Sequence, residues 1–150
     1  MNASPAPLRG VPRSIFRSFF MGGFECSTHW SRHGYRHDLI VQTRHDVFAL
    51  ADYRRMRDLG LLTARDGFRW HADEPEPGRF DFTGARAMVR ASLEAGVEVI
   101  WDLLPVGWPD PVDVFAPEFP ERLEAFAREA ARMLREEGVP APMVAPVNEI

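Results

Sequence analysis

Apolar and polar stretches alternate along the chain in a way that predicts four strands. Nearly continuous apolar runs are typical of strands buried on both faces, and they occur at residues 18–25, 61–67, 97–104 and 143–147. The run at 97–104 has the most strand-like composition. Glycines in the first run indicate a strand whose backbone is closely approached by its neighbours.

Between these runs, three segments carry the apolar spacing of amphipathic helices. The first helix is expected to have Asp46 as its N-cap and to end at Gly60, where a left-handed conformation is tolerated. Its expected apolar face consists of Phe48, Ala51, Met56 and Leu59.

The second and third helices show similar start and stop signals. Thr83 is the expected N-cap of the second, which ends at Gly96, and Pro120 suits the first turn of the third, which ends at Gly138. The second helix has Met88, Ala91 and Leu93 available for packing. The apolar stripe of the third comprises Phe119, Leu123, Phe126, Ala130 and Leu134.

The remaining segments are predicted to be irregular. Residues 28–44 are polar, with three spaced histidines, and are expected to form a long loop. Residues 68–82 contain Pro and Gly breakers, and residues 105–118 are rich in proline. The Ala/Pro-rich residues 1–13 are expected to be a disordered leader, which leaves 14–150 as the folded domain.

Alternating strands and helices predict an α/β fold with parallel pairing through right-handed crossovers. The candidates are a doubly wound sheet and a (β/α)8 TIM barrel. There is no G-x-G-x-x-G or Walker motif, and charged and aromatic residues follow every strand, which favours the barrel. A closed barrel needs about 250 residues, so these 150 residues are expected to form the first four βα units of an incomplete barrel.

Composition bears on partners and location. The formal charge of −4 and the absence of a long basic run argue against a nucleic-acid or anionic-membrane partner. No run approaches the roughly 20 apolar residues of a membrane helix. The single cysteine, Cys26, cannot form an internal disulfide, and a cytoplasmic location is expected. We expect no cofactor.

The fourth apolar run ends in Asn148 and Glu149, an adjacent amide and carboxylate. A carboxylate at a strand's carboxyl end, oriented by an amide, suits general acid/base catalysis, because burial can raise its pKa until it holds a proton at neutral pH. The dipeptide alone is weak evidence.

Three longer motifs support a catalytic role for this dipeptide: TARDGFRWHADEPEPGRFDF at 63–82, VIWDLLPVGWPD at 99–110 and PVNE at 146–149. Together they make the chain resemble the N-terminal half of clan A glycoside hydrolases, most closely the family 1 β-glucosidase-like proteins. The resemblance extends from Phe19 to the C-terminus and includes the spacing of Arg65 and Trp70. It implies a retaining hydrolase of β-linked glycosides that acts in carbohydrate metabolism.

The resemblance also implies roles. Glu149 would be the acid/base, Asn148 would bind the sugar 2-hydroxyl, and Arg65 would sit beneath the nucleophile. The nucleophile belongs to the seventh strand in this family, and retaining hydrolysis needs two carboxyls about 5–5.5 Å apart. The chain alone is therefore expected to be an inactive fragment, with the C-terminal half-barrel or a second copy as its partner.

Several other residues are candidates for sugar contacts. Glu25 and His29 follow the first strand, where the family places a ligand of sugar hydroxyls, although they are also compatible with an ordinary polar surface. Pro105 occupies the position of the family's usual sugar-binding histidine, and proline has no side-chain donor. His71 or Trp108 could take over that contact.

Alternatives remain for the other side chains. Trp70, Trp101 and Trp108 could stack on sugars or belong to the core. Arg65 could instead pair with Asp66 or Glu74.

A metal site at the three histidines, His29, His33 and His37, would require a helix that the surrounding sequence disfavours, so no metal is expected. At the level of function, the alternative to a hydrolase is a non-catalytic half-barrel that binds carbohydrate or another protein chain.

Overall fold

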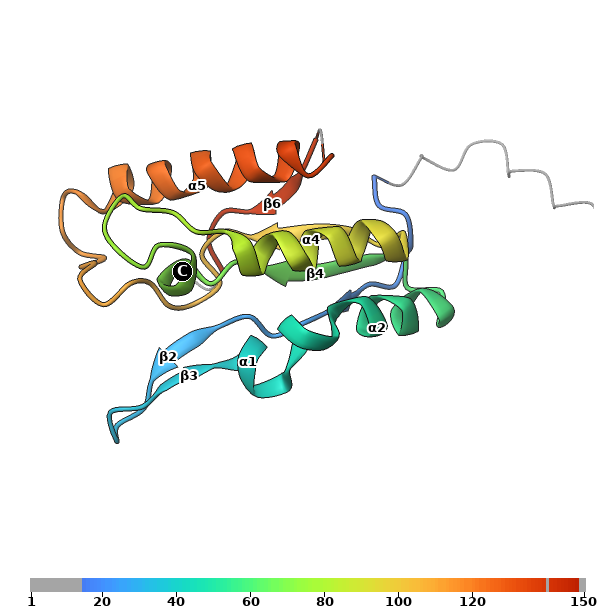
Figure 1. The fold of residues 1–150 in the computed structure, drawn as a ribbon, viewed down its shortest axis with the longest axis horizontal. Helices are drawn as coiled ribbons and strands as arrows, with labels where there is room; N and C mark the ends of the chain where they lie inside the picture. The colour runs from blue at the N-terminus through green and yellow to red at the C-terminus, as the bar shows by residue number, and fades with distance from the viewer. Residues whose placement is uncertain (1–14, 140, 149–150) are drawn as a thin grey trace, which may run out of the picture.

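The computed structural model describes residues 15–139 and 141–148, which form a parallel sheet and three long helices (Figure 1). The sheet order is β1 (Gly22–Gly23), β4 (Thr63–Gly67), β5 (Glu98–Asp102) and β6 (Met143–Ala145), and all neighbours are parallel. Each strand lies within one of the four predicted runs. Over the described residues the sheet remains open, so the fold is α/β with a parallel sheet and not a closed barrel.

The register of β4 and β5 decides which side chains share a face of the sheet. Arg65 pairs with Ile100 and Gly67 pairs with Asp102. Because side chains alternate along a strand, Arg65 and Asp102 lie on one face, while Asp66 lies on the other. Asp66 contacts helix α2 through hydrogen bonds, so Arg65 and Asp102 occupy the face away from that helix.

The three predicted long helices are confirmed as α2 (His45–Asp58), α4 (Thr83–Ala95) and α5 (Phe119–Glu136). Figure 1 shows them side by side, and α4 contacts both of the others. Pro120 lies in the first turn of α5, as predicted, and Gly96 ends α4 with a left-handed φ of 71°. The predicted apolar stripe of α5 is buried or half-buried throughout.

Both predicted N-caps are wrong. Arg44, with a φ of 60°, precedes α2, and Asp46 lies inside the first turn, where its charge suits the helix dipole. In α4, Phe82 holds the cap position and Thr83 is already helical. The N–H of Thr83 donates to Asp81 Oδ1 at 3.0 Å, so the carboxylate one residue before the cap accepts from the first helical N–H.

The predicted apolar face of α2 is also wrong, except for Met56. The buried residues are His45, Ala49, Tyr53 and Met56. Phe48 and Ala51 are exposed, as is Leu59 at the helix end. The helical spacing of apolar residues does not reveal this face, because His45 and Tyr53 are buried through hydrogen bonds to Asp66. In α4, Met88 is buried and Ala91 half-buried as expected, whereas Leu93 is exposed.

The segment predicted as a loop at 28–44 has regular structure. It contains an antiparallel hairpin of β2 (Thr28–Trp30) and β3 (Arg36–Asp38), followed by the short helix α1 (Leu39–Thr43). The side chain of Asp38 caps α1 by accepting from the N–H of Val41 at 3.1 Å. These residues are polar because the hairpin projects from the sheet and is largely exposed, so the apolar alternation of a half-buried strand is missing.

The other two loops are mostly as predicted. Residues 68–82 contain one short helix, α3 (Trp70–Asp73), and an isolated bridge between Glu76 and Arg79. Residues 105–118 contain no helix or strand until α5 begins. Figure 1 shows the hairpin and this proline-rich loop at the same end of the molecule, where the strands have their carboxyl ends.

An aromatic cluster forms the centre of the core. Phe126 of α5 stacks on Trp70 at a centroid distance of 5.1 Å and lies 6.0 Å from Phe68 and 5.8 Å from Phe82. Trp101 of β5 lies 5.6 Å from Phe68. These rings join the sheet to α5 and α3, and their burial stabilises the region that holds the strand ends.

Two expectations fall on residues that are not described. The proposed leader, residues 1–13, and the carboxylate of Glu149 both lie outside the described residues. Among the helices that are described, none is long and apolar enough to cross a membrane.

Candidate active site

Arg65 links side chains from three segments at the carboxyl end of the sheet. Its Nε donates to Asp102 Oδ1 at 2.8 Å, and its Nη2 donates to Asn148 Oδ1 at 2.5 Å. The structure therefore brings together Arg65 and Asn148, two predicted site residues that are 83 positions apart. The guanidinium fork fixes the carboxylate and the amide relative to each other.

The other proposed partners of Arg65 have different contacts. Asp66 accepts from Tyr53 and contacts His45 on the opposite face of the sheet. Glu74 accepts from Trp70 and from Arg122. The alternative in which Arg65 pairs with Asp66 or Glu74 is therefore wrong.

Asp102 is a buried carboxylate that we did not predict as a site residue. Burial raises its pKa, and the hydrogen bond and charge of Arg65 act in the opposite direction. The Cys26 thiol lies 3.9 Å from Asp102 Oδ2. Burial, reinforced by the neighbouring carboxylates, raises the pKa of Cys26 far above its usual range, so the thiol stays protonated and is unsuited to nucleophilic attack.

A cavity of about 100 Å³ lies over this network, and we call it the Arg65 cavity. Its lining residues are Gly23, Phe24, Glu25, Cys26, Arg65, Asp102, Pro105 and Asn148. Glu25 is exposed, and hydrogen bonds from the side chain of Ser27 and from its N–H, which lies 3.0 Å from Oε1, lower the pKa of Glu25 and keep it ionised at neutral pH. The cavity is thus bordered by two acids, one arginine and one amide, which suits a ligand rich in hydroxyl groups.

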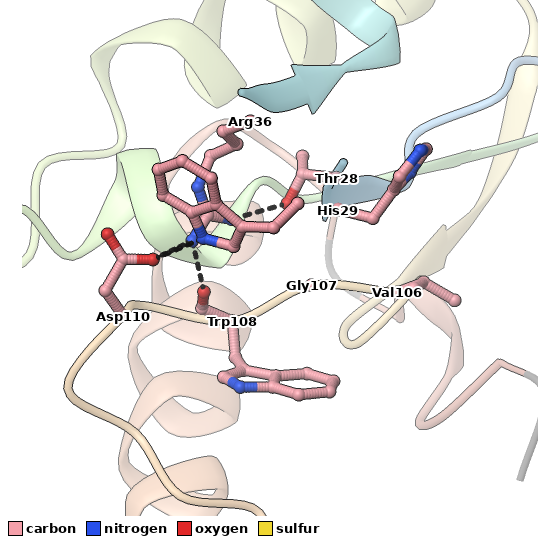
Figure 2. Close-up of a pocket in the computed structure, with 8 residues that line it drawn as sticks. Thr28, His29, Arg36, Val106, Gly107, Trp108 and Asp110 are labelled. Carbon is pink, nitrogen blue, oxygen red and sulfur yellow. Dashed lines mark hydrogen bonds and ion pairs between the residues drawn. The ribbon is translucent and has the colours of Figure 1, made fainter. Parts of the chain in front are cut away.

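A second cavity of about 320 Å³ lies between the β2–β3 hairpin and residues 106–110, and we call it the hairpin cavity (Figure 2). Its lining residues are Thr28, His29, Trp30, Arg36, Val106, Gly107, Trp108 and Asp110. Figure 2 shows Arg36 reaching Thr28, Asp110 and the main-chain carbonyl of Trp108. Hydrogen bonds from Trp30 and Arg36 lower the pKa of Asp110, so this ion pair persists at neutral pH.

The candidate aromatic residues separate into two groups. Trp70 and Trp101 are buried, at 0% and 1% exposure, so neither ring can stack on a sugar and the core alternative holds for both. Trp70 also donates its Nε1–H to Glu74 at 2.6 Å. Trp108 is half-buried and lines the hairpin cavity together with His29.

His71 lies beside the hairpin and does not line the Arg65 cavity. Its Nε2 is 3.4 Å from Asp38 Oδ2, and its Nδ1 is 3.4 Å from Thr28 Oγ1. It lines a separate cavity of about 150 Å³ near Arg36 and Asp110. The position of His71 therefore does not support a direct role in binding a sugar beside Pro105.

The three spaced histidines do not share a helical face, because they belong to the hairpin. His29 and His37 pair across the two strands with their rings stacked 5.2 Å apart, and His33 lies in the connecting turn. In the part of the chain that the structure describes, no group of three or more histidine, cysteine or acidic residues could hold a metal ion.

Sequence reasoning missed Asp102, Arg36 and Asp110. Asp102 carried a usable signal, since it is a carboxylate at the end of the most strand-like run, on the strand that pairs in parallel with that of Arg65. Arg36 and Asp110 carried none, because their contact depends on a hairpin that was predicted as a loop.

No protein-family model and no curated protein matches the chain. Among solved structures, its fold is similar to that of the exo-β-1,4-mannosidase Op5Man5 from Opitutaceae bacterium strain TAV5, with a TM-score of 0.63 and 22% sequence identity. The likeness is one of fold. The match covers 88% of this chain and 25% of the mannosidase, so the chain spans about a quarter of that protein's length. The parallel sheet and its helices thus resemble one part of a TIM-barrel enzyme.

Proposed function

We propose that this chain forms part of a retaining glycoside hydrolase of clan A that acts on β-linked glycosides. The motifs that resemble family 1 β-glucosidase-like proteins support this proposal, and so does the fold shared with a mannosidase. The observation that carries it is the hydrogen-bonded bridge from Arg65 to Asn148 and Asp102 at the carboxyl end of the sheet, the face on which TIM-barrel enzymes hold their active sites.

In the proposed mechanism, Asn148 hydrogen-bonds the sugar and Glu149 acts as the acid/base. Glu149 gives a proton to the glycosidic oxygen while a second carboxylate attacks the anomeric carbon, and the bond to the leaving group breaks. Glu149 then removes a proton from a water molecule, which attacks the anomeric carbon and breaks its bond to the second carboxylate, so that the sugar is released. The second carboxylate is expected from a later strand of the same barrel.

Arg65 has a positioning role in this proposal. Its hydrogen bond holds Asn148 in place, and its charge favours the ionised form of carboxylates next to it. The same charge would favour an ionised nucleophile, as attack on the anomeric carbon requires. Asp102 is the internal counterion that keeps the guanidinium oriented when no substrate is bound.

The test is hydrolysis by a protein in which this chain is joined to four further βα units of the barrel. We expect cleavage of aryl β-glycosides, and we expect Glu149→Gln to lower kcat/KM about 10²–10⁴-fold for substrates with poor leaving groups. The loss should be smaller for a nitrophenyl leaving group, which departs without protonation. Arg65→Gln should lower kcat more than it raises KM.

A matched control is Glu94→Gln, because Glu94 is an exposed acid whose ion pair with Arg54 lies on the helices. Its turnover should equal that of the unaltered protein. Unchanged turnover in Glu149→Gln would refute the assignment of the acid/base. Binding of β-glycosides with no hydrolysis in the joined protein would favour the non-catalytic alternative.

A further inference from the structure

The open sheet ends in two different strands, each with a free edge. Strand β1 pairs only with β4, and strand β6 pairs only with β5, so among the described residues no strand lies beside the outer edge of either one. All four strands are parallel, so the two free edges run in the same direction. The outer edge of β6 in one copy can therefore pair in parallel with the outer edge of β1 in another.

One face of this sheet is also incompletely covered. Parallel sheets are normally buried on both faces. The helices cover one face, whereas on the other face the side chain of Arg65 is 45% exposed and its neighbour Ile100 is only half-buried. Both residues belong to the central strands β4 and β5, so the described residues leave this face without a complete covering layer.

The outer flank of α2 carries an exposed aromatic ring. Arg57 marks the flank toward α4, because its Nη1 donates to the carbonyl of Ala95 at 3.3 Å. At about 100° per residue, Phe48 lies about 180° around the helix from Arg57. Its ring is 50% exposed, and the guanidinium of Arg44 lies 5.5 Å from its centre. The flank of α2 away from α4 therefore has an apolar ring available to a further helix.

The outer flank of α5, at the other end of the helix layer, has small side chains (Figure 1). Glu136 marks the flank toward α4, because it pairs with Arg86 at 2.5 Å. Ala127 lies about 180° and Ala131 about 140° around α5 from Glu136. Both alanines are only half-buried. Small residues leave room for a ring, so this flank is complementary in shape to the flank with Phe48.

A half-turn about an axis along the strands brings both kinds of edge together at once. It places β1 of each copy beside β6 of the other, which joins two four-stranded sheets into a closed barrel of the (β/α)8 type. The same rotation lays α2 of each copy beside α5 of the other, with Phe48 against Ala127 and Ala131. The exposed Arg44 then lies at the same end as the exposed Glu124, which has the opposite charge. This contact forms twice and leaves no free edge.

We propose that two copies of this chain associate through these edges into a closed barrel, with α2 of each copy packed against α5 of the other. Closure pairs both free strand edges and covers the faces that expose Arg65 and Phe48. The proposal depends on the open sheet alone and not on the proposed function. Four further βα units of a longer chain would occupy the same edges, so the test is made on this chain by itself.

The first experiment is cross-linking between two variants in which the single cysteine, Cys26, is replaced by alanine. One variant carries Arg55→Cys, about 160° around α2 from Arg57, and the other carries Ala131→Cys. A short bismaleimide should join the two variants when they are mixed, and should join neither variant to itself. Because Cys26 is buried, it can be kept if its replacement prevents folding.

The matched control for the cross-linking replaces Arg55→Cys by Glu94→Cys, an exposed position on α4, the middle helix of the layer. Mixed with the Ala131→Cys variant, it should give no linked pair. The proposal would be overturned if the Arg55→Cys and Ala131→Cys variants do not link, or if the control links equally well.

A chain that carries both Arg55→Cys and Ala131→Cys distinguishes a closed pair from an open assembly. In a closed barrel each chain can link only to one partner, so the products should stop at two chains. An open head-to-tail assembly or an aggregate would give a ladder of three or more chains, and such a ladder would overturn the proposal.

Sedimentation velocity provides a test without cross-linking. The unaltered chain should form a discrete dimer, and Phe48→Ala should weaken the association about tenfold or more. Because Phe48 is half exposed in the single chain, this variant is expected to fold. The matched control is Phe115→Ala, which removes a 93% exposed aromatic from the loop between β5 and α5 and should dimerise as the unaltered chain does. A dimer that is equally stable in Phe48→Ala, or a monomer at every concentration, would overturn the proposal.

Discussion

His45 is held between two carboxylates in the interior. Its Nδ1 lies 2.8 Å from Asp52 Oδ2 and its Nε2 lies 2.8 Å from Asp66 Oδ2, so both ring nitrogens face an acceptor. Only the imidazolium can donate from both nitrogens. Burial lowers the pKa of His45, but the hydrogen bonds and charges of Asp66 and then Asp52 outweigh it and raise the pKa. The ring also stacks on Phe24 at 3.8 Å.

This geometry predicts that stability depends on pH. Because the folded pKa of His45 lies above its unfolded value of about 6.5, the stabilisation is complete below that value and is lost as the pH rises through the folded pKa. The difference in unfolding free energy between the unaltered chain and His45→Gln should therefore shrink from pH 6 to pH 9, as measured by urea unfolding.

A control for that experiment is His33→Gln, an exposed histidine of the hairpin turn, which should leave the pH profile unchanged. A ring titration of His45 by NMR gives the same information if the variant does not fold. A pH profile that is identical in His45→Gln and the unaltered chain would contradict the prediction.

At the scale of elements, the contact between the hairpin and the loop after β5 depends on one glycine. Gly107 has a φ of 108°, and a Cβ at this position would lie 2.0 Å from the carbonyl oxygen of Thr28 and 2.1 Å from its Oγ1. No side chain fits there unless the backbone moves. The hairpin cavity therefore exists in this form only because residue 107 lacks a side chain.

Gly107→Ala is expected to lower the unfolding free energy by about 2 kcal/mol or more, since a strained backbone alone costs on the order of 1–3 kcal/mol. It should also speed hydrogen exchange at the Thr28 amide, whose bond to Val106 would be displaced. The matched control is Gly78→Ala, where φ is 76° but no atom lies within 4 Å of the added Cβ. This control should show only the strain of the left-handed backbone, and an equal loss in both variants would count against the clash.

The elements also show what sequence patterns can and cannot predict. Strand β5 and helices α4 and α5 were predictable because each buries an apolar run or stripe, as α5 does with Phe126 and Leu134. The β2–β3 hairpin was not, because its residues are held by polar pairs such as Arg36 with Asp110 and have no apolar alternation. The contact between Arg65 and Asn148 was predictable because the carboxyl ends of parallel strands meet at one edge of the sheet. The hairpin cavity was not predictable from the sequence and is seen only in the structure.

For the whole molecule, the edges of the open sheet carry apolar side chains. Phe19 and Phe20, which precede β1, are 89% and 74% exposed. At the other edge, Val144 and Val147 are 40% and 38% exposed. Unpaired strand edges beside exposed apolar residues favour association with other chains.

This chain by itself is therefore predicted to associate as its concentration rises, through pairing with a second copy or aggregation. Sedimentation velocity should show the change, and replacing Phe19 and Phe20 together by serine should reduce it. Phe115→Ser removes an equally exposed aromatic from the loop between β5 and α5 and should have little effect. A monomer that is stable at every concentration would refute the prediction.

The strand order β1–β4–β5–β6 has a consequence for biosynthesis. Each strand of this sheet pairs with the one made immediately before it, with a helix made in between. Assembly can therefore proceed in the direction of translation, one unit at a time, without waiting for a distant part of the chain to leave the ribosome. The side chains that contact Arg65 are synthesised in the same order, Asp102 before Asn148, and Asn148 is the last of the described residues to be made.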